Sequence, residues 1–301
     1  MVFSAEQTVL ESTQPSKTRP PVFLKEFANK NVLTKPGATA EEVLAVTSMI
    51  PASGQHRWFR SMSSSQALTL SVFGNLYQGG QLGLLAGLTC DRGLNLFPPS
   101  KLKERIILEY DVPFLDEPRR TNLDVLFPSH VPIAVECKLT EDKIGNCSRP
   151  LIKTNERKYE SEYCDGKYRV QQGRKERCSL TEQRIRYWEL VPKMFHWDDN
   201  RDYDPCPLNS TYQLVRNVLS ACGEDLIAGR QPMGHCVLLY DERNPHFQAG
   251  GVADKAFTDV LNSLKDPAHL RRCSWQTLVN HLREKGLDDW FSDELRLKYG
   301  F

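Results

Sequence analysis

Two short apolar runs, joined by a turn, carry charged residues at positions where a buried strand is normally apolar. They lie in the stretch TNLDVLFPSHVPIAVECKLTE, from Thr121 to Glu141. Asp124 interrupts the first run, and Glu136 and Lys138 interrupt the second. Apolar runs of this length around a Pro-Ser-His turn are typical of neighbouring strands. Any fold of this chain must therefore place three charges within a sheet and provide partners for them.

Strand geometry predicts that these three charges converge. Side chains alternate across a strand, so Glu136 and Lys138, two positions apart, share one face. Cys137 lies on the other face, where we expect it to pack in the core. Asp124 projects to the side opposite its two apolar neighbours. If the two strands are adjacent, all three charged groups can meet on one side of the sheet.

The chemistry of this group indicates metal-assisted hydrolysis of a phosphodiester. Two carboxylates at close range repel each other unless a cation lies between them. Mg²⁺ prefers oxygen ligands, polarises a phosphoryl oxygen and helps to generate a hydroxide nucleophile. The Lys138 ammonium can neutralise developing charge on phosphorus, or orient and help to deprotonate the attacking water. The alternative is a buried ion pair between Lys138 and one carboxylate, but such pairs seldom offset their desolvation.

Composition and length are those of an ordinary globular protein. The chain has 301 residues, 40% of them hydrophobic and 26% charged, which suits one large domain or two modest ones. No apolar run approaches the length of a membrane-spanning helix. The first residues lack the apolar core of a secretory signal, so we expect a cytoplasmic protein with no membrane partner.

The nine cysteines allow two interpretations. An odd number argues against a fully paired secreted framework, so reduced thiols are the simpler expectation. The other interpretation is a zinc or iron–sulfur site, because Cys147, Cys164, Cys178 and Cys206 lie in one polar region. Their spacing contains no Cys-x-x-Cys pair.

Positive charge gathers between residues 143 and 186, although the whole chain has a net charge of only +1. This segment holds twelve Lys or Arg against six Asp or Glu, with three Tyr among them and Tyr187 and Trp188 directly after. Basic and aromatic side chains together suit a phosphate backbone and exposed bases. The alternative is a solvated, partly ordered insertion. The expected DNA-contacting residues in this segment are Lys143, Arg149, Lys153, Arg157 and Lys158.

The order of predicted elements indicates an α/β fold with a central mixed β-sheet flanked by helices. Helices are expected from Thr39 to about Met49 and over residues 64–78, followed by strands over 104–114, 122–127 and 133–139. A helix over 210–223, capped by Ser210 and stopped by Gly223, precedes a strand over 235–241. Because that strand follows a helix, we expect it to join the sheet in parallel.

Three regions are expected along the chain. An N-terminal arm and short helix occupy residues 1–55. A core with the basic insertion at about 143–205 occupies residues 56–250. A helical C-terminal segment occupies residues 251–301.

The charged strands resemble the signature of the PD-(D/E)XK nuclease superfamily, which has the restriction-endonuclease-like fold. The signature residues here are Asp124, Glu136 and Lys138, although Leu123 replaces the proline of the name-giving pattern. Further stretches resemble a bacterial family of restriction endonucleases within that superfamily. They are SSQAL at 64–68, NLDV at 122–125, ECKLTE at 136–141 followed by GNC, YQLVRN at 212–217 and DERNPHF at 241–247.

The resemblance implies an endodeoxyribonuclease that depends on Mg²⁺ or Mn²⁺, in which Asp124 and Glu136 bind metal and Lys138 is catalytic. Glu109 and the Cys137 carbonyl are further expected ligands, unless Glu109 is a surface charge on an edge strand. Gln213 is expected near the phosphate or a metal-bound water, and hence catalytic.

Other positions match the superfamily less closely. Arg216 is expected to bind phosphate, although ordinary helix surface is the alternative for both Arg216 and Gln213. Gln66 and His56 lie where relatives often carry an acidic ligand, which argues against two tightly bound ions. The stretch from Asp241 to Asn244 is expected to form a turn.

Three alternatives to this function stay open. One is a DNA-binding or assembly protein of the same fold without catalysis. Another is a nuclease that acts on RNA or branched DNA. A third is the same nuclease with an added zinc or iron–sulfur centre. A homodimer is compatible with double-strand cutting, which often requires two active sites.

Overall fold

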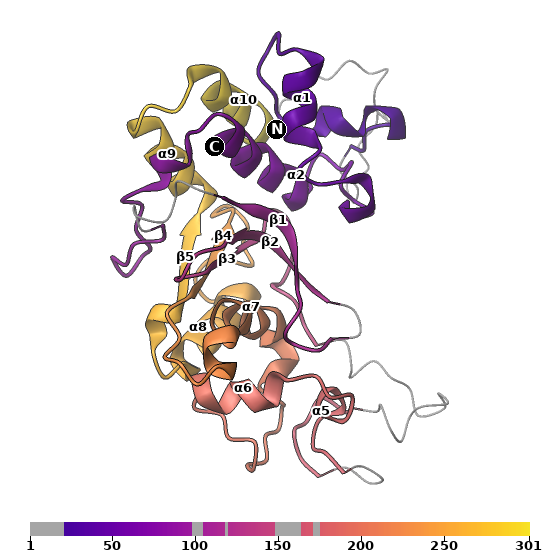
Figure 1. The fold of residues 1–301 in the computed structure, drawn as a ribbon, viewed down its shortest axis with the longest axis vertical. Coiled ribbons are helices and arrows are strands. Elements are labelled where there is room, and N and C mark those ends of the chain that lie inside the picture. Colours follow the sequence, from indigo (N-terminus) through magenta and orange to yellow (C-terminus); the bar gives the residue numbers. More distant parts are fainter. Residues whose placement is uncertain (1–20, 98–104, 118–119, 148–163, 171–174) are drawn as a thin grey trace.

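A five-stranded sheet in the order β1-β2-β3-β4-β5 lies at the centre of the molecule (Figure 1). The computed structural model describes residues 21–97, 105–117, 120–147, 164–170 and 175–301. The strands are β1 Ile107–Val112, β2 Thr121–Phe127, β3 Ile133–Cys137, β4 His235–Tyr240 and β5 Leu270–Ser274. β1, β2 and β3 pair antiparallel, whereas β3, β4 and β5 pair in parallel. The predicted mixed sheet and the parallel entry of β4 are confirmed.

Helices cover both faces of this sheet (Figure 1). The N-terminal helices, α9 and α10 lie over one face, and α6, α7 and α8 lie over the other. The N-terminal helices are α1 Ala40–Thr47 and α2 Ser65–Thr69, which continues through a π-helical turn, Leu70–Gly74, into α3 Asn75–Gln78. The later ones are α5 Ser179–Glu182, α6 Tyr187–Met194, α7 Leu208–Ile227, α8 Val252–Ser263, α9 Trp275–Glu284 and α10 Asp289–Tyr299. None of the helices in the described ranges is long and apolar enough to cross a membrane.

Each face of the sheet has its own hydrophobic core. The first core contains Phe73, Phe127 and Trp275, whose rings meet in edge-to-face and tilted contacts with centroids 6.0 and 6.4 Å apart. The second core contains Leu214 of α7 and Phe257 of α8. β3 lies between the two cores and is buried along its whole length. Burial on both faces explains why its sequence is apolar at nearly every position.

The long helix α7 is longer at both ends than the sequence predicted. It begins at Leu208 and runs to Ile227, so Ser210 lies in its first turn instead of capping it. Gly223 lies within the helix and does not stop it. A Cβ atom at Gly223 would come within 2.6 Å of the Phe114 ring, so this glycine is explained by close packing rather than by helix termination.

The predicted helical C-terminal segment also contains a strand, β5. Its sequence, LRRCS, places two arginines in the middle of the strand, which hides it from an apolar pattern. β5 is the edge strand next to β4, and edge strands often carry charge. Arg272 is paired with Asp91 at 2.9 Å and Asp254 at 2.7 Å. These partners are distant in sequence and do not show in the local pattern.

Candidate active site

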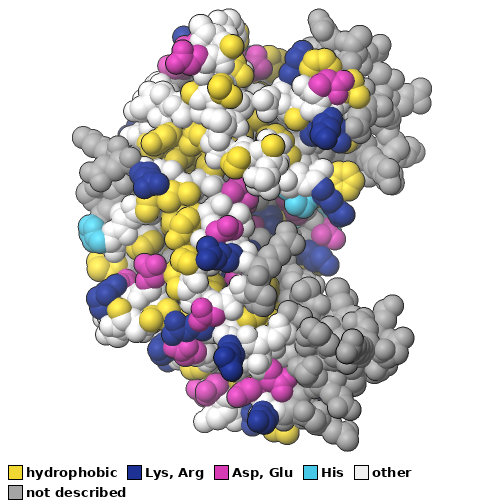
Figure 2. All heavy atoms as spheres, turned by 45° about the vertical axis from the view of Figure 1, so that its right-hand side comes forward, with side chains coloured by type: hydrophobic (Ala, Val, Ile, Leu, Met, Phe, Trp, Pro, Cys, Tyr) yellow, Lys and Arg dark blue, Asp and Glu magenta, His cyan; other side chains and the backbone are white. Residues whose placement is uncertain are grey.

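A cleft of about 700 Å³ opens beside the strands β1 to β3. Figure 2 shows the hollow on one side of the molecule, where acidic, basic and histidine side chains gather. Its walls come from β1, β2, β3, the loop after β3, α7 and the segment before and within α2. Among the lining residues are all the carboxylates predicted from the strands, together with Lys138 and Gln213.

Asp124 lies where the antiparallel pairing of β2 and β3 ends. The last pair in register on this side is Val125 with Val135. Beyond it, Asp124 Oδ2 accepts a hydrogen bond of 2.6 Å from the backbone N–H of Cys137. Leu123 and Val125, which the alternation placed on one side of the strand, pack in opposite cores. The regular alternation therefore breaks at Asp124, where its carboxylate replaces a strand partner.

Glu109 marks a second distortion, directly across from Asp124 in the register of β1 and β2. The flanking pairs are Leu108 with Val125 and Tyr110 with Leu123. Glu109 has a φ of +51°, which is rare for a side-chain-bearing residue in a strand. The result is that Glu109 lines the cleft, so it is not a surface charge on an edge strand.

Glu136 and Lys138 form a buried ion pair that α7 completes. Lys138 Nζ lies 2.8 Å from Glu136 Oε1, and their side chains are only 10% and 2% exposed. Gln213 donates to Glu136 Oε1 at 2.6 Å and accepts from Lys138 at 3.2 Å. Asn217 donates to Glu136 Oε2 at 2.5 Å. The two amides therefore hold the carboxylate from the helix side.

Asn217 was not singled out from the sequence. It lies four residues after Gln213 and is fully buried, so both amides project from one face of α7. A pair of amide side chains at this spacing within the predicted helix was the available signal.

The carboxylates of the cleft are crowded enough to shift their ionisation. Burial, then the charges of Glu136 and Glu109, raises the pKa of Asp124 well above its usual range. Burial also raises the pKa of Glu109 to about 7; a hydrogen bond from Gln66 opposes this shift and the Glu136 charge adds to it. Burial and the close approach of the carboxylates therefore both act against full ionisation of the site.

Lys138 remains an ammonium in this setting. Burial acts to lower the pKa of Lys138, but the carboxylates of Glu136, Glu141 and Asp124 outweigh burial and raise it. A protonated lysine in a cleft suits stabilisation of phosphate charge rather than proton abstraction.

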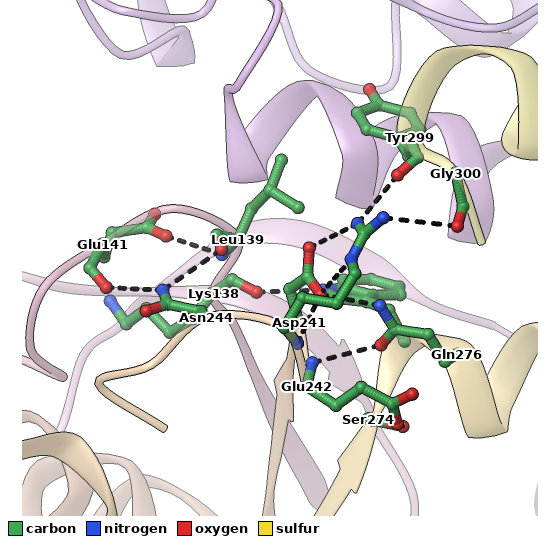
Figure 3. Close-up of polar contacts among 12 residues, drawn as sticks. Lys138, Leu139, Glu141, Asp241, Glu242, Asn244, Ser274, Gln276, Tyr299 and Gly300 are labelled. Atoms are coloured by element: carbon green, nitrogen blue, oxygen red, sulfur yellow. Dashed lines mark hydrogen bonds and ion pairs between the residues drawn. The ribbon is translucent and has the colours of Figure 1, made fainter. Parts of the chain in front are cut away.

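The strand end that carries Lys138 is held by side chains of distant elements that donate to its backbone carbonyls (Figure 3). Trp275 of α9 donates its indole N–H to the Lys138 carbonyl at 3.0 Å. Asn244 donates to the carbonyls of Leu139 at 3.3 Å and Glu141 at 2.8 Å. Asn244 belongs to the predicted turn after β4, where its N–H bonds to the Asp241 carbonyl. This turn and α9 therefore fix the path of the chain out of β3.

The loop after β3 makes a very close approach to α7. Gly145 has a φ of +148°, and its carbonyl accepts a hydrogen bond from the Gln213 N–H at 3.3 Å. A Cβ atom at Gly145 would lie 2.2 Å from Gln213 Oε1. Only glycine allows this contact, so Gly145 helps to define where the Gln213 amide lies.

Comparison with known proteins agrees with these features. The model of one protein family, described as Restriction Endonuclease associating with ARP, matches residues 4–300. The chain belongs to this family. No match was found among curated proteins or among solved structures. Membership of a restriction endonuclease family, predicted from Asp124, Glu136 and Lys138 and the stretches around them, is confirmed, and the mixed sheet with flanking helices is consistent with a restriction-endonuclease-like fold.

The other residues predicted from the sequence to act in the site fall into three groups: those that line the cleft, those that lie outside its lining, and those outside the described residues. His56, Gln66 and Cys137 line the cleft. Lys143 is exposed beyond the β3 loop, and Arg216 lies over the Tyr212 ring at 5.8 Å without lining the cleft. The predicted DNA contacts outside the described residues are Arg149, Lys153, Arg157 and Lys158.

The donor set of the cleft fits a divalent cation in its chemistry. Glu109, Asp124 and Glu136 supply hard oxygen ligands, and burial, with the charges of neighbouring carboxylates, raises the pKa of Glu109 and of Asp124. Within the described ranges, no three His, Cys, Asp or Glu side chains are already arranged around one ion position. Glu136 Oε1 contacts Lys138 and Gln213, whereas Oε2 accepts from Asn217 and keeps a lone pair that an ion could use.

Proposed function

We propose that this restriction endonuclease family member hydrolyses phosphodiester bonds in DNA with the help of Mg²⁺ or Mn²⁺. The observation that carries the proposal is the floor of the cleft, where three carboxylates and one buried ammonium meet. A purely structural charge cluster would be neutralised by its own partners. Here burial and like charges keep the acids of the floor difficult to ionise, which favours a cationic ligand.

The carboxylates and the lysine would have different roles in the reaction. Asp124, Glu136 and Glu109, with the Cys137 carbonyl, would hold the ion. A bound divalent cation supplies Lewis acidity toward a phosphoryl oxygen and makes a nearby water more acidic. Lys138 would neutralise charge that develops on the transferred phosphoryl group, because it stays protonated.

α7 would keep the ammonium and the carboxylate in place. Gln213 contacts both Glu136 and Lys138, so rotation of its amide would disturb both groups. Gln213 also lines the cleft, where it would contact a bound phosphate. The exposed Lys143 at the exit of β3, and the basic segment that follows it, would contact the DNA backbone.

Cleavage of supercoiled plasmid by the purified chain tests the proposal. Reactions would contain EDTA, Mg²⁺ or Mn²⁺, with wild type beside Asp124→Asn and Lys138→Met. Lys255→Met on α8 is the matched control, because Lys255 is exposed and lies outside the cleft lining. Metal-dependent nicking or linearisation that both cleft variants lose and the control keeps is the expected result.

Two other outcomes would redirect the assignment. Cleavage that Asp124→Asn and wild type share equally would come from a contaminant. DNA binding without cleavage under any metal condition would contradict catalysis and favour an assembly role. The same reactions on RNA and branched DNA would show whether duplex DNA is the preferred substrate.

A further inference from the structure

A solvent-exposed tryptophan, Trp58, lines the cleft together with the carboxylates. Its side chain is 49% exposed, and it is the only exposed aromatic side chain among the residues that the structure describes. The other exposed large hydrophobic side chains in those ranges are not aromatic and do not line the cleft. Scattered exposed apolar groups are normal on a protein surface, so the position of Trp58 distinguishes it, not its exposure alone.

The neighbours of Trp58 in sequence divide between core and solvent. Phe59 is 1% exposed and belongs to the first hydrophobic core, so it anchors the segment. Arg57 is exposed, and its guanidinium lies over the Trp58 ring with Cζ 5.2 Å from the centroid. A cation over an aromatic ring is a favourable contact that leaves the guanidinium N–H groups available for a ligand.

The segment that carries Trp58 is fixed by a buried amide. Asn31 donates to the carbonyl of Phe59 at 2.6 Å and to that of Ser61 at 2.7 Å. The N–H of Ser61 donates to the Trp58 carbonyl at 2.8 Å, which closes the turn. Asn31 in turn accepts from Lys298 of α10 at 2.8 Å. A ring on a backbone held in this way loses little conformational freedom when a ligand binds.

Hydrogen bonds also connect Trp58 to the acids of the cleft floor. The Trp58 N–H donates to His56 Nδ1 at 3.3 Å, and the His56 N–H donates to Gln66 Oε1 at 2.8 Å. The Gln66 amide donates to the Gly54 carbonyl at 3.0 Å and bonds to the Glu109 carboxylate. His56 and Gln66, which do not supply acidic ligands, therefore set the position of the ring relative to the floor.

The chemistry of this wall suits a nucleotide. An indole ring stacks on any nucleobase, and an adjacent arginine attracts the phosphate backbone. The hydroxyl side chains of Ser61, Ser63 and Ser64 line the same cleft and are typical partners of sugar and phosphate oxygens. A volume of about 700 Å³ is that of a site for a small ligand, so one nucleotide has room in it.

Stacking on Trp58 restricts the form of the DNA. A base in an intact duplex is already stacked on both of its faces, so a protein ring can stack only on a base that has left the helix. An exposed tryptophan also suits a protein partner, but such anchors normally lie in a desolvated apolar patch. The residues next to Trp58, His56 and Arg57, are polar and exposed, which favours a nucleotide.

We propose that Trp58 stacks on an unpaired base of the substrate, so that this chain prefers DNA with an unpaired nucleotide at the cleft to intact duplex. The inference rests on the proposed function, since it takes the cleft as the place where DNA binds. Trp58 would act in binding and specificity, and Arg57 would neutralise a phosphate of the same strand. The stacked base would hold the neighbouring phosphate beside the carboxylates of the floor.

Binding of matched oligonucleotides, measured in EDTA and in Ca²⁺, tests the proposal without cleavage by Mg²⁺ or Mn²⁺. The ligands are an intact duplex, the same duplex with one bulged nucleotide, and the same bulge without its base. Wild type should bind the base-bearing bulge about 10-fold more tightly than the abasic bulge, because one base stacks. Trp58→Ala should lose this preference, whereas Trp58→Phe, which keeps a ring, should retain most of it.

Leu44→Ala is the matched control, because Leu44 is an exposed hydrophobic residue on α1 outside the cleft lining. It should keep the preference of the wild type. Equal binding of the base-bearing and abasic bulges by wild type overturns the proposal. An unchanged preference in Trp58→Ala, or no binding of bulged DNA in either condition, overturns it as well.

A fluorescent base supplies a readout that does not depend on the folding of the alanine variant. With 2-aminopurine as the bulged base, binding of wild type should quench the emission, because the base stacks on the indole. The same analogue placed in the paired region should change little. Unchanged emission from the bulged analogue when the wild-type chain is bound contradicts stacking.

The two proposals for the cleft can fail separately. Binding that depends on Trp58, without cleavage in Mg²⁺ or Mn²⁺, would support the stacking and contradict the nuclease. Metal-dependent cleavage of the bulged duplex at equal rates by wild type and Trp58→Ala, with equal affinities, would support the nuclease and overturn the stacking.

Discussion

The two halves of the sheet treat buried acids in opposite ways. Near β4 and β5 the acids have their own cations: Asp241 pairs with Arg243 at 2.6 Å, and Asp254 pairs with Arg272 at 2.7 Å. The bonds from Arg243 outweigh burial and lower the pKa of Asp241, and the bond from Arg272 lowers that of Asp254. These acids are stable as carboxylates without any ligand.

Near β1 to β3 the acids lack such partners. Burial and mutual repulsion raise the pKa values of Asp124 and Glu109, and of the lysines and arginines in the described ranges only Lys138 lines the cleft. The contrast teaches that a buried charge alone does not indicate function. What distinguishes the cleft is a group of acids whose pKa values burial and neighbouring carboxylates raise, at a place that a ligand can reach.

The largest expected effect comes from neutralising one acid in each half. Asp124→Asn should reduce cleavage by about 1,000-fold, because it removes a metal ligand, and should leave the free energy of unfolding unchanged or raise it by about 1 kcal/mol in EDTA. Asp241→Asn should instead lower the free energy of unfolding by about 2 kcal/mol and change cleavage little, because it breaks a satisfied ion pair. Urea unfolding and plasmid cleavage of both variants check this.

For the contrast to hold, Asp241→Asn must lower the free energy of unfolding and Asp124→Asn must not. Equal losses of stability in Asp124→Asn and Asp241→Asn would show that Asp124 is as well satisfied as Asp241. The stability measurement decides this point even if no cleavage is found.

The pH dependence of stability should also have opposite signs in the two halves. In the folded chain Glu109 has a pKa of about 7, above the ordinary 4.5, so the folded state binds more protons between these values. Stability therefore falls as pH rises from 4.5 through 7, by on the order of 3 kcal/mol. Glu109→Gln should remove this loss in EDTA.

Asp254 supplies the opposite case. Its pKa is lowered on folding, so its contribution is present at neutral pH and is lost as pH falls. Unfolding curves of wild type, Glu109→Gln and Asp254→Asn at pH 4.5 and 8 measure both slopes. If Glu109→Gln leaves the wild-type slope unchanged, the pKa of Glu109 is not raised in the folded chain.

Much of the cleft could be predicted because charge in an apolar strand is rare, even though the regular alternation of side chains breaks at Asp124. Asp124, Glu136 and Lys138 follow from that pattern, and the family resemblance adds Gln213 and Glu109. All five line the cleft.

The parts that could not be predicted depend on contacts between distant segments. β5 carries Arg271 and Arg272 within its five residues, and the partners of Arg272 at Asp91 and Asp254 lie in other elements. The sequence alone predicts that Gly223 ends the helix, because the Phe114 ring that packs against it comes from a distant segment. The role of Asn217, which donates to Glu136, depends on the packing of α7 against β3 and is not visible in the local sequence.

A smaller loss of cleavage is expected from disturbing the close packing of Gly145 against α7 at the cleft. Gly145→Ala should lower cleavage by about 10- to 100-fold, because the added methyl group displaces the Gln213 amide from Glu136 and Lys138. Gly229→Ala is the matched control, since its φ is +70° and a Cβ atom there meets nothing within 4 Å. That variant should lose about 1 kcal/mol of stability from backbone strain and keep its cleavage. Equal cleavage by both variants would show that the Gln213 amide is not critical.

The smallest effect concerns the turn that joins the two halves, drawn in Figure 3. Asn244→Ala removes the bonds to the Leu139 and Glu141 carbonyls, so the chain beyond Lys138 loses a restraint and cleavage should fall about 3- to 10-fold. Gln276→Ala is the control in the ion-paired region near β4, because the Gln276 amide donates to Asp241 at 2.6 Å rather than to the chain that follows β3. It should lose stability only. A larger cleavage loss in Gln276→Ala than in Asn244→Ala would mean that the ion-paired region near β4 and β5 positions Lys138 at least as strongly as the turn does. The cleft and that region would then not be functionally separate.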